Sequence, residues 1–242
     1  MVRLHVGHPL GAGQSVPLDR DQAHRLGAVM RLGPGDPVEL FDGRSGAWSA
    51  RIEALGKRGG AAVCEALAAP QRDPPDLWLM FAPLKRGRID YAVEKATELG
   101  VARILPVLTR RTVAERVRTD RLHAYARAAA EQCGGTFVPA VAEPTALDRL
   151  LDAWPAERAL VFADEALSDD PAWRGEGEAA PLPPAPAAVL IGPEGGFDDA
   201  ERARIRALPQ AAPLSLGPRI LRADTAAVAA LTLWQAARGD WR

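Results

Sequence analysis

The chain has 242 residues, of which 48% are hydrophobic and 25% are charged, and its formal net charge is −1. These values are ordinary for a soluble globular protein of one or two domains. The two cysteines, Cys64 and Cys133, are far apart and the four histidines show no ligand spacing, which excludes a disulfide framework and predicts no metal site. No run of 18 apolar residues occurs, and the first ten residues hold no long apolar stretch. We therefore expect a cytoplasmic protein that does not enter a membrane.

Charge is distributed unevenly along the chain. Between Lys85 and Arg127 there are eleven Lys or Arg residues against five Asp or Glu residues, whereas the rest of the chain to its C-terminus has ten against seventeen. A basic middle section indicates a polyanionic partner, although solvated helix faces in an arginine-rich protein explain it equally well.

The first 70 residues predict a small β-barrel with one helix. Short β-prone runs at 3–6, 37–41, 47–55 and 61–67 are separated by turn sequences rich in Gly. A helix is expected over 19–30, because Asp19 can cap its first turn. Residues 70–76 have the composition of a linker, so we expect one domain over 1–70 and a second over 77–242.

From residue 77 onwards, apolar strands alternate with helices, which predicts a parallel α/β sheet covered on both faces. The expected strands are 77–83, 101–108, 158–163, 187–191 and 213–216, and the expected helices are 89–99, 120–132, 146–154, 198–208 and 225–238. Gly100 is placed to end the first of these helices. Acidic residues three positions after Thr145 and Asp198 indicate capped helix starts.

Two consecutive strand-to-helix loops contain an unusual combination of residues. The sequence IGPEGGF (191–197) follows one strand, and LGPRILRADTA (216–226) follows the next. In open α/β sheets the ligand crevice lies outside the carboxyl ends of the strands, so both loops are expected at one site. Their glycines allow the backbone to approach a ligand closely, and Pro193 and Pro218 stiffen the loops.

The first loop does not match the known phosphate-binding loops. It contains no GK[ST], and no GxGxxG follows a strand at the start of a βαβ unit. Glu194, in its middle, would repel a phosphate but suits a cationic or hydroxyl-rich ligand, such as a sulfonium attached to a ribose. In the second loop, Asp224 fits a helix N-cap. Arg222 either binds an anionic group at the site or pairs with Asp224 or Glu194.

Together the two loops resemble the paired signature of RsmE-type enzymes, which are small-subunit ribosomal RNA uridine-N3 methyltransferases of the SPOUT superfamily. Similar stretches continue through HRLGAVMRLGPGDPVELFDG (24–43), YAVEKATELGV (91–101) and AAAEQCGG (128–135), so the resemblance covers nearly the whole chain. The chain departs from the family pattern at Gly135, where many members have an arginine, and at Asp224, where many have a glutamate.

The resemblance implies an N-terminal PUA-like RNA-binding β-barrel and a C-terminal SPOUT α/β domain whose last segment threads a trefoil knot. It also implies S-adenosyl-L-methionine as cofactor, small-subunit ribosomal RNA as substrate, and a homodimer. The cofactor-binding residues expected in this chain are Ala163, Glu165, Leu190, Gly192, Gly195, Gly196, Leu216, Gly217, Ile220, Leu221, Thr225 and Ala226. The RNA-binding residues expected are Arg25, Arg31, Lys85, Arg86 and Arg88.

Methylation at uridine N3 requires an unpaired base, because this nitrogen lies on the Watson–Crick edge. We expect Arg222 to stabilise charge on a uracil oxygen or to bind an adjacent phosphate. We expect Glu194 to act as general base or to orient the cofactor. Cys133 is expected to be buried and inert, since methylation of a nitrogen needs no cysteine adduct.

Two alternatives of other classes stay open. A non-catalytic RNA-binding ribosome-assembly factor that retains the SPOUT fold would keep the basic groups, but it need not keep Glu194 together with both glycine-rich loops. An α/β enzyme acting on a small metabolite is disfavoured by the basic middle section, and salt-sensitive RNA binding would exclude it.

Overall fold

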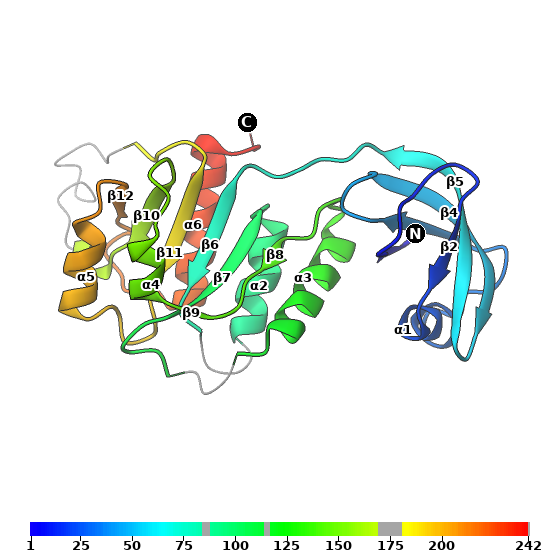
Figure 1. Cartoon of the computed structure of the whole chain (residues 1–242), viewed down its shortest axis with the longest axis horizontal. Helices are drawn as coiled ribbons and strands as arrows, with labels where there is room; N and C mark the ends of the chain where they lie inside the picture. The colour runs from blue at the N-terminus through cyan, green and yellow to red at the C-terminus, as the bar shows by residue number, and fades with distance from the viewer. Residues whose placement is uncertain (84–87, 114–116, 169–180, 242) are drawn as a thin grey trace. The chain divides into compact units, whose positions relative to one another are not determined.

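The computed structural model describes residues 1–83, 88–113, 117–168 and 181–241, so the predicted RNA-binding residues Lys85 and Arg86 lie outside the described residues. The chain divides into two compact units (Figure 1). The first consists of Met1–Asp73 with Arg127–Val138, and the second of Pro74–Ala126 with Pro139–Arg242. Within the described residues, no helix combines the length and the apolar character that crossing a bilayer requires.

The first unit contains a five-stranded sheet in the order β1-β3-β4-β5-β2. Its strands are β1 (Val2–His5), β2 (Ser15–Leu18), β3 (Pro37–Phe41), β4 (Ala47–Gly56) and β5 (Gly59–Ala69). β1 and β3 pair in parallel, and the other neighbours are antiparallel. Four strands lie where the sequence predicts them. β2 was missed because it is short and contains Pro17, which is tolerated here since β2 is an edge strand.

The predicted helix at 19–30 is α-helical only in its first part, α1 (Arg20–His24). Asp19 caps it as expected: its Oδ1 accepts a hydrogen bond from Gln22 N at 2.8 Å, and the Gln22 side chain accepts one from Asp19 N at 2.9 Å. The chain then widens into a π-helical turn, η1 (Arg25–Val29). Shortly after it, Arg31 has a φ of 59°, a left-handed conformation that is uncommon outside glycine.

The end of one helix, α3 (Thr119–Cys133), belongs to the first unit through its residues from 127 onwards. Arg3 Nη1 donates to Ala130 O at 3.3 Å, and Arg3 Nη2 donates to Gly135 O at 3.2 Å. Cys133 is exposed rather than buried, so that expectation was wrong. It is the last residue of α3, and the two glycines that follow offer no side chains to cover it.

The second unit is built on a parallel sheet in the order β12-β10-β11-β6-β7-β8, with β9 beside β7. Its strands are β6 (Leu77–Phe81), β7 (Arg103–Leu108), β8 (Ala140–Val141), β9 (Thr145–Ala146), β10 (Ala159–Ala163), β11 (Ala187–Ile191) and β12 (Ala211–Leu214). All recorded pairs are parallel, which confirms the predicted α/β sheet. β8 and β9 are too short to leave a periodic signal in the sequence.

Helices cover both faces of this sheet. They are α2 (Arg88–Glu98), α3, α4 (Leu147–Asp152), α5 (Asp199–Arg206) and α6 (Ala223–Arg238), with a short 3₁₀ turn, η2 (Glu165–Leu167). α4 and α5 share one hydrophobic core with the strands, to which Leu151 and Ile205 contribute together with Phe162 and Leu190. α2 and α6 pack beside each other on the opposite face (Figure 1).

Helix caps explain where several of these helices begin and end. The predicted capping box of α5 is confirmed, with Glu201 N donating to Asp198 Oδ1 at 2.7 Å. Gly100 ends α2 with a φ of 72°, also as predicted. The expected cap at Thr145 was wrong. Thr145 lies in β9, its hydroxyl donates to the carbonyl of Glu143, and Ala146 occupies the N-cap of α4 without a side-chain hydrogen bond.

Candidate functional site

Three neighbouring strands end at one pocket of the second unit. β12, β10 and β11 are adjacent and parallel, so the segments that follow them emerge at the same edge of the sheet. The pocket there has a volume of about 550 Å³, which suits a small organic ligand or cofactor. The site therefore lies where the strand-edge rule places it, with a third loop, after β10, beside the two that stand out in the sequence.

The structure brings most of the predicted site residues to this pocket. The lining residues predicted from the sequence are Ala163, Glu165, Gly192, Glu194, Gly196, Leu216, Gly217, Ile220, Leu221, Arg222 and Ala226, together with Arg88 from the expected RNA-binding set. Three expected cofactor residues do not line it. Leu190 is fully buried in the core beneath the sheet, Gly195 faces Arg111, and Thr225 is exposed on α6.

The glycine-rich loop after β11 packs tightly against the buried ring of Phe197. A Cβ at Gly192 would lie 2.8 Å from the Phe197 ring, which is fully buried and packs edge-on against Phe162 with ring centroids 5.3 Å apart. Gly196 has a φ of 67°, which favours glycine. Two of the three glycines in GPEGG therefore fill positions where a side chain would strain the backbone or collide.

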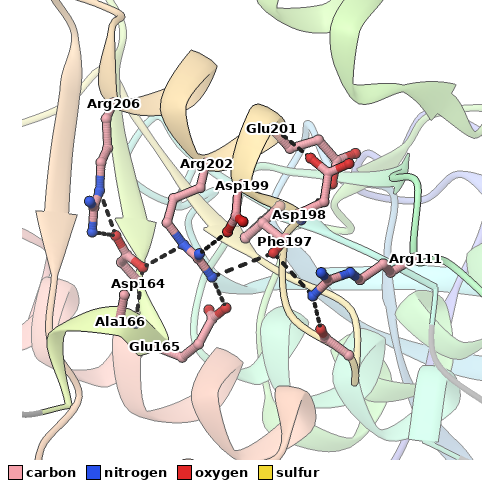
Figure 2. Close-up of polar contacts among 11 residues, drawn as sticks. Arg111, Asp164, Glu165, Ala166, Phe197, Asp198, Asp199, Glu201, Arg202 and Arg206 are labelled. Atoms are coloured by element: carbon pink, nitrogen blue, oxygen red, sulfur yellow. Dashed lines mark hydrogen bonds and ion pairs between the residues drawn. The ribbon is translucent and has the colours of Figure 1, made fainter.

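An arginine from the loop after β7 braces the same segment. Arg111 Nη1 donates to Gly195 O at 2.8 Å and to Phe197 O at 3.4 Å, as Figure 2 shows for Phe197. Its neighbour Arg110 pairs with Asp198 at 2.8 Å. Two hydrogen bonds to its carboxylate, first from the backbone N–H of Glu201 and then from the Arg110 side chain, lower the pKa of Asp198. Both arginines come from the basic middle section, so two of its charges serve the loop.

The turn after β10 carries a network of charged groups (Figure 2). The side chain of Asp164 is fully buried and accepts a hydrogen bond from Arg206 Nε at 2.9 Å. Arg202 Nη2 lies 2.5 Å from Glu165 Oε1, and Arg202 Nε lies 3.3 Å from Asp164 Oδ1. Burial opposes the charge of Arg202, but Glu165 and the two nearby aspartates outweigh it and raise the pKa of this guanidinium.

The loop after β12 forms another wall of the pocket. Ser215 Oγ donates to Leu167 O at 2.9 Å, which ties this loop to the turn after β10. Gly217 has a φ of 97°, and Ile220, which lines the pocket, is 80% exposed. Glu194 and Arg222, the two residues predicted to be catalytic, both line the pocket and are exposed.

Asp224 does not cap α6 as expected. Arg222 is the N-cap residue, with φ −66° and ψ 151°, and α6 begins at Ala223, so Asp224 lies inside the first turn. There its carboxylate favours the positive end of the helix dipole and pairs with Arg88 Nη1 at 3.3 Å. Within the part of the chain that the structure describes, Asp224 therefore pairs with Arg88 and not with Arg222.

The remaining basic candidates lie in the first unit. Arg25 Nη1 is 2.5 Å from Glu131 Oε2, so much of its charge is compensated. Arg31 is exposed, and the neighbouring Val29 and Met30 are exposed apolar residues. Arg31 is exposed to solvent and, among the described residues, makes no ion pair comparable to that of Arg25.

Several pocket residues were missed in the sequence. Ser168, Ser215 and Arg219 line the pocket, and two of them, Ser215 and Arg219, directly flank predicted residues. Asp164, which also lines it, lies within the stretch 163–165 that the resemblance implies as a third cofactor loop. All of them follow β10 or β12, so the meeting of loops at the carboxyl edge of the sheet is the signal that points to them. No metal site is predicted, and the described residues hold no cluster of three His, Cys, Asp or Glu side chains arranged for an ion.

A parallel sheet with a glycine-lined pocket at its carboxyl edge, in a chain that also holds a separate sheet-rich unit, defines a ligand-binding α/β protein of two parts. Family models agree with this division: an RNA methyltransferase PUA domain matches residues 18–63, and an RNA methyltransferase domain matches residues 71–235. The second match covers more than half of the chain, so the chain belongs to this RNA methyltransferase family.

Individual relatives agree with the family match. The ribosomal RNA small subunit methyltransferase E of Synechocystis sp. is 30% identical over 219 residues, which are 90% of this chain and 71% of the relative. The protein of that name from Rickettsia conorii is 27% identical over 95% of this chain and 93% of its own length. The resemblance to RsmE-type enzymes is thereby confirmed.

Solved structures are similar over the full length of the chain. A ribosomal RNA small subunit methyltransferase E from Neisseria gonorrhoeae, bound to S-adenosyl methionine, has a TM-score of 0.84 at 29% identity, with 100% of both chains covered. A Legionella pneumophila protein in complex with the cofactor SAM has a TM-score of 0.86 at 30% identity, covering 99% of this chain and 98% of the other.

Proposed function

We propose that this protein transfers a methyl group from S-adenosyl-L-methionine to N3 of a uridine in small-subunit ribosomal RNA. Methylation of small-subunit ribosomal RNA follows from its membership of the family and from its named relatives. The observation that carries the proposal is the pocket at the ends of β10, β11 and β12, which gathers the glycine-rich loop, Glu194 and Arg222.

The residues of the pocket fit this cofactor. Any side chain larger than that of glycine at position 196 would crowd Glu165 at the pocket wall. Because Gly196 has no side chain, its backbone can lie close to a flat adenosyl group. Apolar groups from Leu216 and Leu221 can cover the adenine. The Glu165 carboxylate offers an acceptor for hydroxyl groups, and the Glu194 carboxylate suits hydroxyl or cationic groups. When bound, the cofactor supplies an activated methyl group on a positively charged sulfur.

The chain's own contribution to the chemistry is positioning and charge. Arg222 presents a guanidinium at the pocket rim, where it can stabilise negative charge on a uracil oxygen as the N3 proton leaves. Glu194, exposed at the same pocket, is placed to accept that proton or to orient the cofactor. A single electrostatic donor of this kind typically contributes about 10²–10³ in kcat.

The RNA would be held by both units. We assign residues 1–70 to a PUA-like barrel that binds RNA and residues 77–242 to a SPOUT domain with a trefoil knot, joined by 70–76. The position of β11 between β10 and β6 supports a non-sequential chain path. Arg31, with exposed Val29 and Met30 beside it, is the better RNA-binding candidate of the first unit, because Arg25 is paired with Glu131.

We further propose a homodimer through α2 and α6. Tyr91 on α2 and Leu233 on α6 are 44% and 42% exposed, and these two helices pack beside each other. A neighbouring pair of helices with exposed large apolar side chains is a suitable surface for a second copy of the chain.

The function is tested by incubating the purified protein with radiolabelled S-adenosyl-L-methionine and small ribosomal subunits that lack this methylation. We expect incorporation into small-subunit RNA and 3-methyluridine in the nuclease digest, with large subunits as the control substrate. Salt-sensitive binding of the subunits without any methyl transfer would favour a non-catalytic assembly factor and overturn the proposal.

A further inference from the structure

Glu165 is a carboxylate held at one wall of the pocket. It opens η2 directly after β10, and its side chain is 33% exposed. The preceding residue, Asp164, fixes the start of this turn, because its Oδ1 accepts a hydrogen bond from Ala166 N at 3.1 Å. The backbone under Glu165 is therefore well anchored.

Arg202 lies behind Glu165, on α5, and is not among the residues that line the pocket. Figure 2 shows its guanidinium between Glu165, Asp164 and Asp199. Nη2 lies 2.5 Å from Glu165 Oε1, Nε lies 3.3 Å from Asp164 Oδ1, and Nη1 lies 3.2 Å from Asp199 Oδ1. Only 19% of the Arg202 side chain is exposed, and its planar guanidinium is held in place by these three carboxylates. Its Nη2 is the nitrogen that faces Glu165.

Glu165 is confined from its other side by Gly196. A Cβ at position 196 would lie 3.2 Å from Glu165 Cδ and closer still to its Oε1. The recorded contact with Arg202 uses the same oxygen, Oε1. Within the described residues, this arrangement leaves Oε2 as the oxygen that can serve a ligand in the pocket.

Charge decides which part of the methyl donor such a carboxylate suits. Because Arg202 already compensates its charge, Glu165 is a weak partner for the cationic sulfonium but remains an acceptor for neutral hydroxyls. An acidic residue that accepts from ribose hydroxyls after a strand of a parallel sheet is a known solution in dinucleotide-binding folds.

We propose that Arg202 is a positioning residue, which holds the Glu165 carboxylate so that it accepts a hydrogen bond from a ribose hydroxyl of the methyl donor. This inference rests on the proposed function, because it requires S-adenosyl-L-methionine in the pocket. It assigns to a residue outside the pocket a share in recognition of the donor's ribose.

The test compares S-adenosyl-L-methionine with its 2′-deoxy and 3′-deoxy analogues by calorimetric titration. For the wild type we expect at least one deoxy analogue to bind about tenfold more weakly, because a pocket acceptor then loses its partner. Glu165→Gln and Arg202→Met are both expected to weaken the parent donor and to bring the ratio between parent and deoxy analogue close to one.

Two further variants separate positioning from a general loss of structure. Arg202→Lys keeps a charge beside Glu165 and is expected to restore part of the discrimination. Arg204→Met is the matched control, because it removes an arginine from the same helix whose ion pairs are with Asp148 and Asp152 instead. Removal of Arg202 leaves Asp164 paired with Arg206, so the buried carboxylate retains a counterion.

The outcomes are distinct. A wild type that binds both deoxy analogues as tightly as the parent, or an Arg202→Met variant that keeps the wild-type ratio, would overturn this inference while leaving the proposed function intact. A folded wild type that binds no donor, alone or with small subunits present, would overturn the proposed function itself.

Discussion

Glu165 and Gly196 are in close steric contact at the pocket: a Cβ at position 196 would lie 3.2 Å from Glu165 Cδ and closer still to its Oε1. Gly196 also has a φ of 67°, so a side chain there would strain the backbone as well. Since Arg202 holds Glu165 at 2.5 Å, the carboxylate is not free to move aside. The loop after β11 and the turn after β10 therefore depend on each other's shape.

Gly196→Ala is expected to weaken binding of S-adenosyl-L-methionine about tenfold or more, because it strains the loop and displaces Glu165. Gly195→Ala is the matched control in the same loop. Its Cβ would meet only Arg111, at an ordinary 3.7 Å, and its φ lies outside the left-handed region. Calorimetric titration of both variants checks the prediction, and equal affinities would contradict it.

Gly192→Ala is expected to destabilise the second unit by about 1–3 kcal/mol, the usual range for overpacking. The added methyl would lie 2.8 Å from the ring of Phe197, which is fully buried. Urea denaturation followed by tryptophan fluorescence measures the change, with Gly195→Ala again as control. A variant as stable as the wild type would show that the ring can be displaced at little cost.

Much of the pocket could be predicted because one rule of parallel sheets collects distant loops. IGPEGGF and LGPRILRADTA are separated in the chain, yet both follow strands and so meet at one edge. The ion pair of Arg202 with Glu165, 37 residues apart, could not be predicted in this way. It depends on which turn of α5 faces the end of β10, and no sequence period specifies that.

Other misses have local causes. Asp224 satisfies the usual preference for an N-cap, but the extended Arg222 starts α6 earlier and Arg88 supplies Asp224 with a partner from another helix. The π-helical turn after α1 follows from no residue pattern in RLGAV, which has the composition of an ordinary helix apart from one glycine. For Asp224, the tertiary contact with Arg88 is what the sequence could not show.

The stability of the first unit is expected to fall as the pH is lowered from about 7 to 5. Burial, then the charge of Arg127, lower the pKa of His5 below its ordinary value of 6.5, although Glu131 and Asp42 act in the opposite direction. The unfolded chain therefore binds this proton more readily than the folded one. The contribution of His5 to the free energy of unfolding is fully present above pH 6.5, and it is lost as the pH falls towards the pKa of His5 in the folded protein.

His5→Gln removes this titration and is expected to flatten the decline, even if it lowers stability at pH 8 by removing the edge-on contact with Phe41. Thermal melting of both proteins between pH 5 and pH 8 gives the comparison, with the exposed His8→Asn as the control. An identical slope in the wild type and in His5→Gln would assign the pH dependence to other groups.

Leu233→Glu is expected to convert a homodimer into a monomer, because it places a charge on the apolar face of α2 and α6. Light scattering after size-exclusion chromatography gives the mass directly. Leu67→Glu is the matched control, since Leu67 is 52% exposed on β5 of the first unit. A wild type that is monomeric at micromolar concentration would contradict the proposed dimer at once.

Arg222→Met is expected to lower kcat about 10²–10³-fold while leaving donor affinity within about threefold of the wild type, because the guanidinium acts on charge that develops during transfer. Its backbone stays in place, since the Arg222 carbonyl accepts a hydrogen bond from Ala226 N at 2.8 Å as α6 begins. Arg222→Lys retains the charge but not the planar guanidinium, so its kcat should fall between those of the wild type and Arg222→Met.

Arg238→Met, at the other end of α6, is the control. Single-turnover methylation of small subunits, with donor binding measured separately, makes the comparison. A loss confined to donor affinity would instead make Arg222 a cofactor-binding residue.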